Sequence, residues 1–289
     1  MLRFLVPLAA LLAAGEVAAQ PAAAPPCESA LALPQSLLAG NPRFVIMGET
    51  HGTDTSPEVF GDLVCGFAAT RPVVVHLELP NSLDEDFARY LAAPGPETLA
   101  PITRSWAFTN RLYDGRTSEA FLALIERLGA MARAGLPVKV NASQPDHPTL
   151  RPQHYYEMAM AADWAGAAAL QQEAINLVLV GSFHARRGAM PDGRKGAAEF
   201  LMPDHFVALA ECGEGGAAAV LRPGPDGRPV EGIMAMLDLG EGRPRGVYPR
   251  SEFTRSPSGY GLDAFDGFFC AGRPAQASPR AMLPDPNAP

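Results

Sequence analysis

The sequence predicts an α/β fold, a layered domain with a mostly parallel central sheet, helices on both faces, and antiparallel strands added near the C-terminal end. Three observations lead to this prediction. Short apolar, β-branched runs recur along the chain, helical patterns fill the intervals between them, and a glycine-rich GEGG turn divides the last strand-like segments. Uninterrupted apolar runs are typical of strands that are buried on both faces of a parallel sheet.

Five apolar runs mark the expected strands, and they cover residues 44–47, 73–79, 138–140, 177–180 and 206–210. We expect the last of them to pair antiparallel with residues 217–221 across the GEGG turn. Four helical patterns lie between the runs. One starts at Ser56-Pro57-Glu58, one follows a capping box of Ser82 and Glu85, one covers 118–134 and ends at Gly135, and one covers about 152–174.

The composition describes a globular protein of 289 residues, with 47% apolar and 19% charged residues. The formal net charge is −8, which argues against nucleic acid as a partner and against docking on anionic lipid. We expect residues 27–271 to form a single α/β domain, preceded by a flexible leader at 20–26 and followed by a loose tail at 272–289. No apolar run after the N-terminus is long enough to be an integral membrane span.

The N-terminus has the pattern of a signal peptide at residues 1–19. Arg3 is followed by an apolar run at 4–14, and small residues stand at Val17 and Ala19, the positions that a signal peptidase reads. An uncleaved anchor is the alternative. The pattern predicts a periplasmic or secreted protein.

Four cysteines fit that compartment, because an even number in an oxidising space is typical of disulfide bridges. Their spacing contains no CxxC or Cys/His pattern of a zinc site. We favour the pairs Cys27–Cys65 and Cys212–Cys270, since each joins a chain end to a nearby element. Buried free thiols are the alternative.

Polar side chains collect where the expected strands end, which is where parallel sheets bind ligands. Glu49 and His51 follow the first strand, Glu78 ends the second, and His184 follows the fourth with Arg186 and Arg187 directly after it. A carboxylate beside an imidazole suits general acid–base catalysis, and the arginines could bind an anionic group of a substrate.

The residues alone leave structural interpretations open. Glu49 could cap a helix, His51 could be an ordinary loop residue, and Glu78 could be structural or pair with His76, which is itself a candidate core histidine. The two arginines could lie in a solvated loop. The set Glu49, His51, Glu78 and His184 could also bind a divalent metal ion, and the sequence does not decide whether it does.

Three segments resemble a known superfamily in their order and spacing. They are FVIMGETHGT followed by a helix, VVVHLELP, and NLVLVGSFHARRGAMP, within roughly residues 43–210. The superfamily joins erythromycin-esterase-like proteins, ChaN-like haem-binding uptake proteins and the Tiki/TraB proteases. Its members often carry a further glutamate after the GExHG motif, and here either Asp54 or Glu58 could take that place.

The resemblance implies an α/β domain whose pocket is lined by Glu49, His51, Glu78 and His184. In the esterase-like branch the residue matching His51 activates water, which here implies a hydrolase, esterase-like or peptidase-like, acting on a small-molecule or peptide substrate. We expect Glu49 and Glu78 to orient His51, and His184 with Arg186 to stabilise the oxyanion. In the ChaN-like branch the domain binds haem without turnover, with Tyr155, Tyr156 or His184 as candidate iron ligands.

Overall fold

The computed structural model describes residues 27–110, 113–146, 153–239 and 242–281. The expected signal peptide at 1–19 and leader at 20–26 lie outside the described residues. A seven-stranded sheet forms the centre of the molecule, with the order β3-β2-β4-β1-β5-β9-β8. Its strands are β1 (Phe44–Glu49), β2 (Val73–Pro80), β3 (Val138–Gln144), β4 (Ile175–Gly181), β5 (Phe206–Glu211), β8 (Gly246–Pro249) and β9 (Gly267–Cys270).

All neighbouring strands in this sheet run parallel except β8, which pairs antiparallel with β9. The predicted α/β class is therefore confirmed, including the antiparallel addition near the C-terminus. The predicted pairing of 206–210 with 217–221 is wrong. Every residue of β5 is buried, and the strand lies inside the main sheet beside β1, whereas β6 (Ala217–Pro223) pairs with β7 (Pro229–Ala235) in a separate hairpin.

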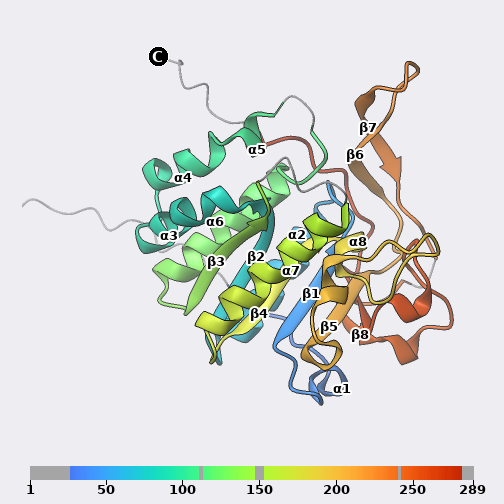
Figure 1. Ribbon diagram of the computed structural model, residues 1–289, viewed down its shortest axis with the longest axis horizontal. Coiled ribbons are helices and arrows are strands. Elements are labelled where there is room, and N and C mark those ends of the chain that lie inside the picture. The colour runs from blue at the N-terminus through green and yellow to red at the C-terminus, as the bar shows by residue number, and fades with distance from the viewer. Residues whose placement is uncertain (1–26, 111–112, 147–152, 240–241, 282–289) are drawn as a thin grey trace, which may run out of the picture.

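Helices cover both faces of the sheet (Figure 1). They are α1 (Gln35–Leu38), α2 (Thr55–Ala68), α3 (Asp84–Ala92), α4 (Pro96–Thr103), α5 (Trp106–Thr109), α6 (Glu119–Arg133), α7 (Gln153–Leu170) and α8 (Ser182–Ala185). Short 3-10 turns lie at Asn81–Leu83, Ala197–Phe200, Pro203–His205, Arg250–Glu252 and Leu262–Ala264. The predicted capping by Ser82 is absent, because the turn at Asn81–Leu83 leads into α3 and no side chain caps that helix.

Alternate side chains of each central strand enter two separate cores. In β1, Val45 and Met47 pack with α2, α3 and α6, while Phe44 and Ile46 pack on the other face with α7. Figure 1 shows α7 crossing the near face of the sheet. Helices cover both faces of the sheet, so the apolar side chains of each strand are packed on both sides. This packing also fixes where the strands end.

The C-terminal segment differs from the predicted loose tail. Ala275, Ser278 and Ala281 are buried, and isolated bridges join Ala277 to Thr53 and Arg280 to Ser118. The segment packs through backbone hydrogen bonds and a few small side chains, so it has no apolar periodicity that the sequence could reveal. Residues 282–289 lie outside the described residues.

Disulfide bonds join Cys27 to Cys65 and Cys212 to Cys270, the two pairs favoured from the sequence. The first ties the start of the described chain to α2, and the second ties the end of β5 to the end of β9. Both suggest a protein that acts outside the cytoplasm. Within the described ranges, no helix has the length and apolar character that crossing a membrane requires.

Candidate active site

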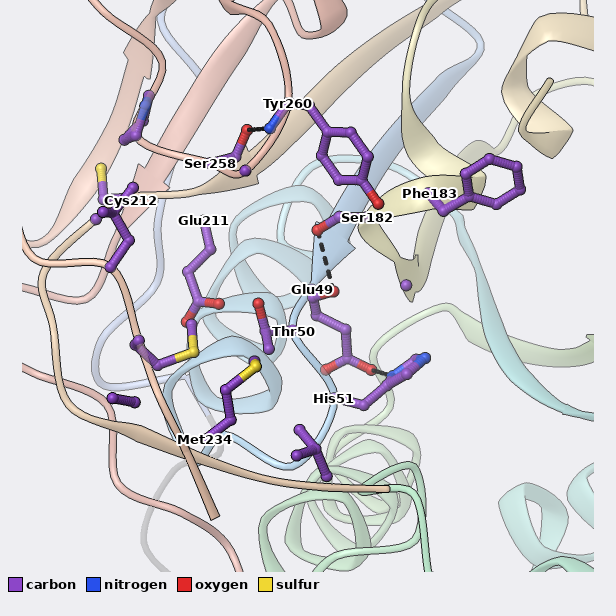
Figure 2. A pocket seen from close by; sticks show the side chains of 18 of the residues that line it. Glu49, Thr50, His51, Ser182, Phe183, Glu211, Cys212, Met234, Ser258 and Tyr260 are labelled. Atoms are coloured by element: carbon purple, nitrogen blue, oxygen red, sulfur yellow. Dashed lines mark hydrogen bonds and ion pairs between the residues drawn. The ribbon is translucent and has the colours of Figure 1, made fainter. Parts of the chain in front are cut away.

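A cavity of about 560 Å³ opens at the carboxyl ends of the central strands. The ends of β1, β4 and β5 form its floor, and the β6–β7 hairpin and the loop around Tyr260 form its other walls. Figure 2 shows that Glu49 lies between His51 on one side and Glu211 on the other. The residues that line it include Glu49, His51, His184, Glu211, Leu221 and Met234.

The turn after β1 places His51 against Glu49. The Nδ1 atom of His51 lies 2.8 Å from Oε1 of Glu49, and because an ionised carboxylate only accepts hydrogen bonds, Nδ1 carries the proton. Gly52 makes this turn possible. Its φ is +78°, and a Cβ there would meet the carbonyl oxygen of Ala219 at 2.0 Å. The Nε2 atom of His51 is thereby left for other partners.

Glu78 lies at the centre of the site and has four partners. Its carboxylate accepts hydrogen bonds from the backbone amide of Gly181 at 2.8 Å and from Nη1 of Arg116 at 3.0 Å. Its two oxygens also face Nε2 of His51 and Nε2 of His184, each at 3.5 Å. The side chain of Glu78 is only 3% exposed. An ionised carboxylate can be buried this deeply because positive groups and donors surround it.

His184 repeats the arrangement of His51 on the other side of Glu78. Its Nδ1 atom lies 2.7 Å from Oε2 of Glu157, which is fully buried on α7. Gly181 allows the close packing, since a Cβ there would lie 2.9 Å from Nε2 of His51. We call Glu49, His51, Glu78, His184 and Glu157 the carboxylate–histidine chain.

The charges of this chain shift the pKa values of its members. Burial lowers the pKa of His51, but the charges of Glu78 and Glu49 outweigh burial, so this pKa lies above the usual value. The pKa of His184 is raised in the same way by Glu78 and Glu157 against the effect of burial. Burial favours the neutral form of Glu78, yet His184, His51 and Arg116 together lower the pKa of Glu78 to about 2. Each imidazolium is therefore stabilised by carboxylates on both sides.

Arg116 completes the charge balance next to Glu78. Its guanidinium also pairs with Asp114, and burial of Arg116 is outweighed by the charges of Glu78 and Asp114, so the pKa of Arg116 is raised. Asp114 lines the cavity. Arg116 thus holds the central carboxylate through an ion pair with Oε1 of Glu78.

Glu211 ends β5 and is 8% exposed at the cavity. Its Oε1 accepts a hydrogen bond from Oγ1 of Thr55 at 2.9 Å. Its Oε2 is buried and has no hydrogen-bond partner among the described residues. Burial is the main reason that the pKa of Glu211 is raised to about 7, and the nearby Glu49 charge adds to it.

The structure brings four sequence candidates together, namely Glu49, His51, Glu78 and His184, and places the two arginines elsewhere. Neither arginine is among the described residues that line the cavity. Arg187 pairs with Asp266 at 2.7 Å and covers the ring of Phe206. Arg186 is 8% exposed and lies over the ring of Tyr260, which itself lines the cavity.

Other side chains singled out in the sequence have structural partners. His76 is fully buried within β2 and bonds to Asn176 and Asn141 rather than to Glu78, and burial lowers the pKa of His76 to about 4. Asp54 and Glu58 both pair with Arg273, so neither joins the carboxylate–histidine chain. Tyr155 is half exposed, and the ring of Tyr156 lies 6.0 Å from that of His184.

The side chains of the site were also candidates for binding a divalent metal ion. In the described part of the chain, no three His, Cys, Asp or Glu side chains are arranged to bind one metal ion. The Nδ1 atoms of both histidines already have carboxylate partners, and both Nε2 atoms face the same glutamate. In the structure, both imidazoles are thus held by contacts with carboxylates.

Three residues of the site went unnoticed in the sequence analysis. Glu157 occupies a position in the buried stripe of α7, where a charged residue is a signal for a polar partner. Glu211 ends an apolar strand just as Glu49 and Glu78 do. Arg116 lies in an irregular segment before α6, and no pattern in the sequence marks it.

Comparison with known proteins identifies solved structures that share this fold. No family model matches the chain, and no curated protein matches its sequence. Among solved structures, the chain has the fold of the erythromycin esterase EreC, solved as a histidine-to-asparagine mutant in its open conformation. The two are 10% identical with a TM-score of 0.64, over 86% of this chain and 94% of that one. A succinoglycan biosynthesis protein aligns at 13% identity with a TM-score of 0.52, over 86% of this chain and 92% of that one. The likeness confirms the fold that the sequence resemblance implied.

Proposed function

We propose that this chain is a hydrolase in which His51 takes a proton from water and the resulting hydroxide attacks the carbonyl carbon of an ester or peptide substrate. The observation that carries the proposal is the pairing of His51 with two carboxylates. Glu49 fixes the Nδ1–H tautomer, which leaves Nε2 to accept the proton, and Glu78 stabilises the imidazolium that forms. The fold of a known esterase supports the same reaction class.

The other members of the chain have complementary roles in the proposal. Glu157 holds His184 in place, and the raised pKa of His184 favours the protonated ring. The Nε2–H of His184 is therefore suited to donate to the oxyanion of the tetrahedral intermediate. Arg116 and the amide of Gly181 hold Glu78 between the two rings. The hydroxyl of Ser182 donates to the backbone carbonyl of Glu49, so it is not paired with a base as a nucleophile would be.

We also propose that the protein is exported, with residues 1–19 as a signal peptide. The two disulfide bonds support this location, because such bonds persist outside the reducing cytoplasm. N-terminal sequencing of exported material should then begin near Gln20, and an intact Met1 in the cytoplasmic fraction would contradict it.

A screen of esters and peptides with the purified protein tests the reaction, together with the variant His51→Asn. Asparagine keeps a donor for Glu49 and removes the nitrogen that accepts the proton, so we expect kcat to fall by about 10²–10⁴-fold with little change in melting temperature. His154→Asn, the same substitution at an exposed position of α7, is the control. No turnover by the wild type, or full activity of His51→Asn, would contradict the proposal. A Soret band on haem addition without turnover would favour haem binding instead.

A further inference from the structure

Glu211 is a buried carboxyl group in the cavity that the proposed roles leave unused. Of its two oxygens, one accepts from Thr55 and the other has no partner among the described residues. An ionised carboxylate in this position would lack donors for a buried oxygen, which is costly. A protonated carboxyl group avoids much of that cost, and buried polar groups without partners are frequent at functional sites.

The register of the sheet places Glu211 directly beside the catalytic residues. Gly48 of β1 is aligned with Ala210 of β5, so Glu49 and Glu211 are the next residues on two adjacent strands, whose backbones are spaced by about 5 Å. The charge of Glu49 raises the pKa of Glu211, so the two buried carboxyl groups do not ionise equally easily. Glu49 has the imidazole of His51 as its partner, whereas Glu211 has no cationic partner: Thr55 donates to it, and the hydroxyl of Ser56 and the backbone amide of Thr50, also neutral donors, lower its pKa only in part. The environments therefore favour charge on Glu49 and a proton on Glu211.

We infer that Glu211 is the general acid of the site, and that it protonates the leaving oxygen of an ester while His51, on the other side of Glu49, activates the water. This inference rests on the proposed hydrolase function. Figure 2 shows Glu211 and His51 on either side of Glu49 in the same cavity. Burial raises the pKa of Glu211 to about 7, which keeps a large share of the group protonated at neutral pH.

Hydrolysis of an ester by these groups involves two proton transfers. The oxygen of water forms a bond to the carbonyl carbon while Nε2 of His51 takes one of its protons. The bond between that carbon and the leaving oxygen then breaks, and the leaving oxygen keeps the electron pair and takes the proton of Glu211. The products are a carboxylic acid and an alcohol, and Glu211 regains a proton that His51 releases to water in the cavity.

Two esters with the same acyl group and different leaving groups test the assignment. Ethyl alkoxide needs a proton to leave, whereas 4-nitrophenolate leaves without one. In Glu211→Gln, which is nearly isosteric but has no acidic proton, we expect kcat/KM for the ethyl ester to fall by about 10²-fold or more. The value for the 4-nitrophenyl ester should stay nearly unchanged. Glu214→Gln, which alters a glutamate outside the cavity lining, should affect neither ester.

The outcomes separate this inference from the proposed function. A wild type that hydrolyses both esters, with Glu211→Gln slowing both equally or neither, overturns the role of Glu211 and leaves the hydrolase proposal intact. A wild type that hydrolyses only the 4-nitrophenyl ester also overturns that role. A wild type that hydrolyses neither ester, nor any other substrate, overturns the hydrolase proposal, and the inference falls with it.

A second measurement checks the proton on Glu211 without any substrate. Because the pKa of Glu211 is raised from 4.5 to about 7 in the folded chain, ionisation on going from pH 5 to pH 8 destabilises the fold. The melting temperature of the wild type should therefore fall more over this range than that of Glu211→Gln. Equal falls in the two proteins would contradict a protonated Glu211.

Discussion

The two walls of the cavity differ in chemistry and in burial. One wall consists of the ends of β1, β4 and β5, and next to it the carboxylate–histidine chain is buried and tied together by hydrogen bonds at 2.7–3.0 Å. The other is the β6–β7 hairpin, which presents apolar side chains and leaves much of β7 exposed, with Met234 43% exposed. Under the proposed function, we expect the sheet to fix the positions of the reacting groups and the hairpin to contact the apolar part of a substrate.

The largest effect is expected if the wall that holds the carboxylate–histidine chain, here called the polar wall, works as one unit. If His51 and His184 act through the shared Glu78, removing either should cost about 10²-fold or more in kcat/KM, and removing both should cost little more than the worse single variant. His51→Asn, His184→Asn and the double variant measure this. Losses that multiply would show two independent contributions and would contradict a single unit.

A smaller effect is expected on the hairpin wall. Leu221→Ala removes apolar surface from the cavity lining, so we expect KM to rise by about 5- to 30-fold with kcat nearly unchanged, because about 1–2 kcal/mol of uniform binding is lost. Ile233→Ala is a matched control, since Ile233 lies on the same hairpin, is 63% exposed and is outside the lining. A fall in kcat instead of a rise in KM would assign the hairpin a part in the chemistry.

The same contrast explains what the sequence could predict. Glu49, His51, Glu78 and His184 each follow an apolar run, so the rule that ligands bind beyond the carboxyl ends of parallel strands was sufficient to predict them. Glu211 follows an apolar run as well. The predicted antiparallel pairing of residues 206–210 leaves this strand end outside the predicted site, and that pairing is wrong because β5 lies beside β1 in the parallel sheet.

Other features depend on contacts that leave no local pattern. Arg116 reaches Glu78 from a segment without regular structure, and the tail around Ser278 is held by backbone bridges and hydrogen bonds. The sequence predicts Arg187, three residues after His184, to lie near the substrate. In the structure, Arg187 instead forms an ion pair with Asp266, which is distant in sequence. Such pairings arise from tertiary packing, so only the folded chain reveals them.

The central claim is that the charge of Glu78 sets the basicity of His51, and the pH dependence of Glu78→Gln tests it most directly. In the wild type, kcat/KM for the 4-nitrophenyl ester, whose leaving group needs no acid, should rise with pH as His51 loses its proton, with a midpoint above the usual 6.5 because Glu78 and Glu49 raise the pKa of His51. Glutamine keeps the shape of Glu78 without its charge, so this rise should move to lower pH while the plateau falls by about 10²-fold. An unchanged midpoint in Glu78→Gln would contradict the account.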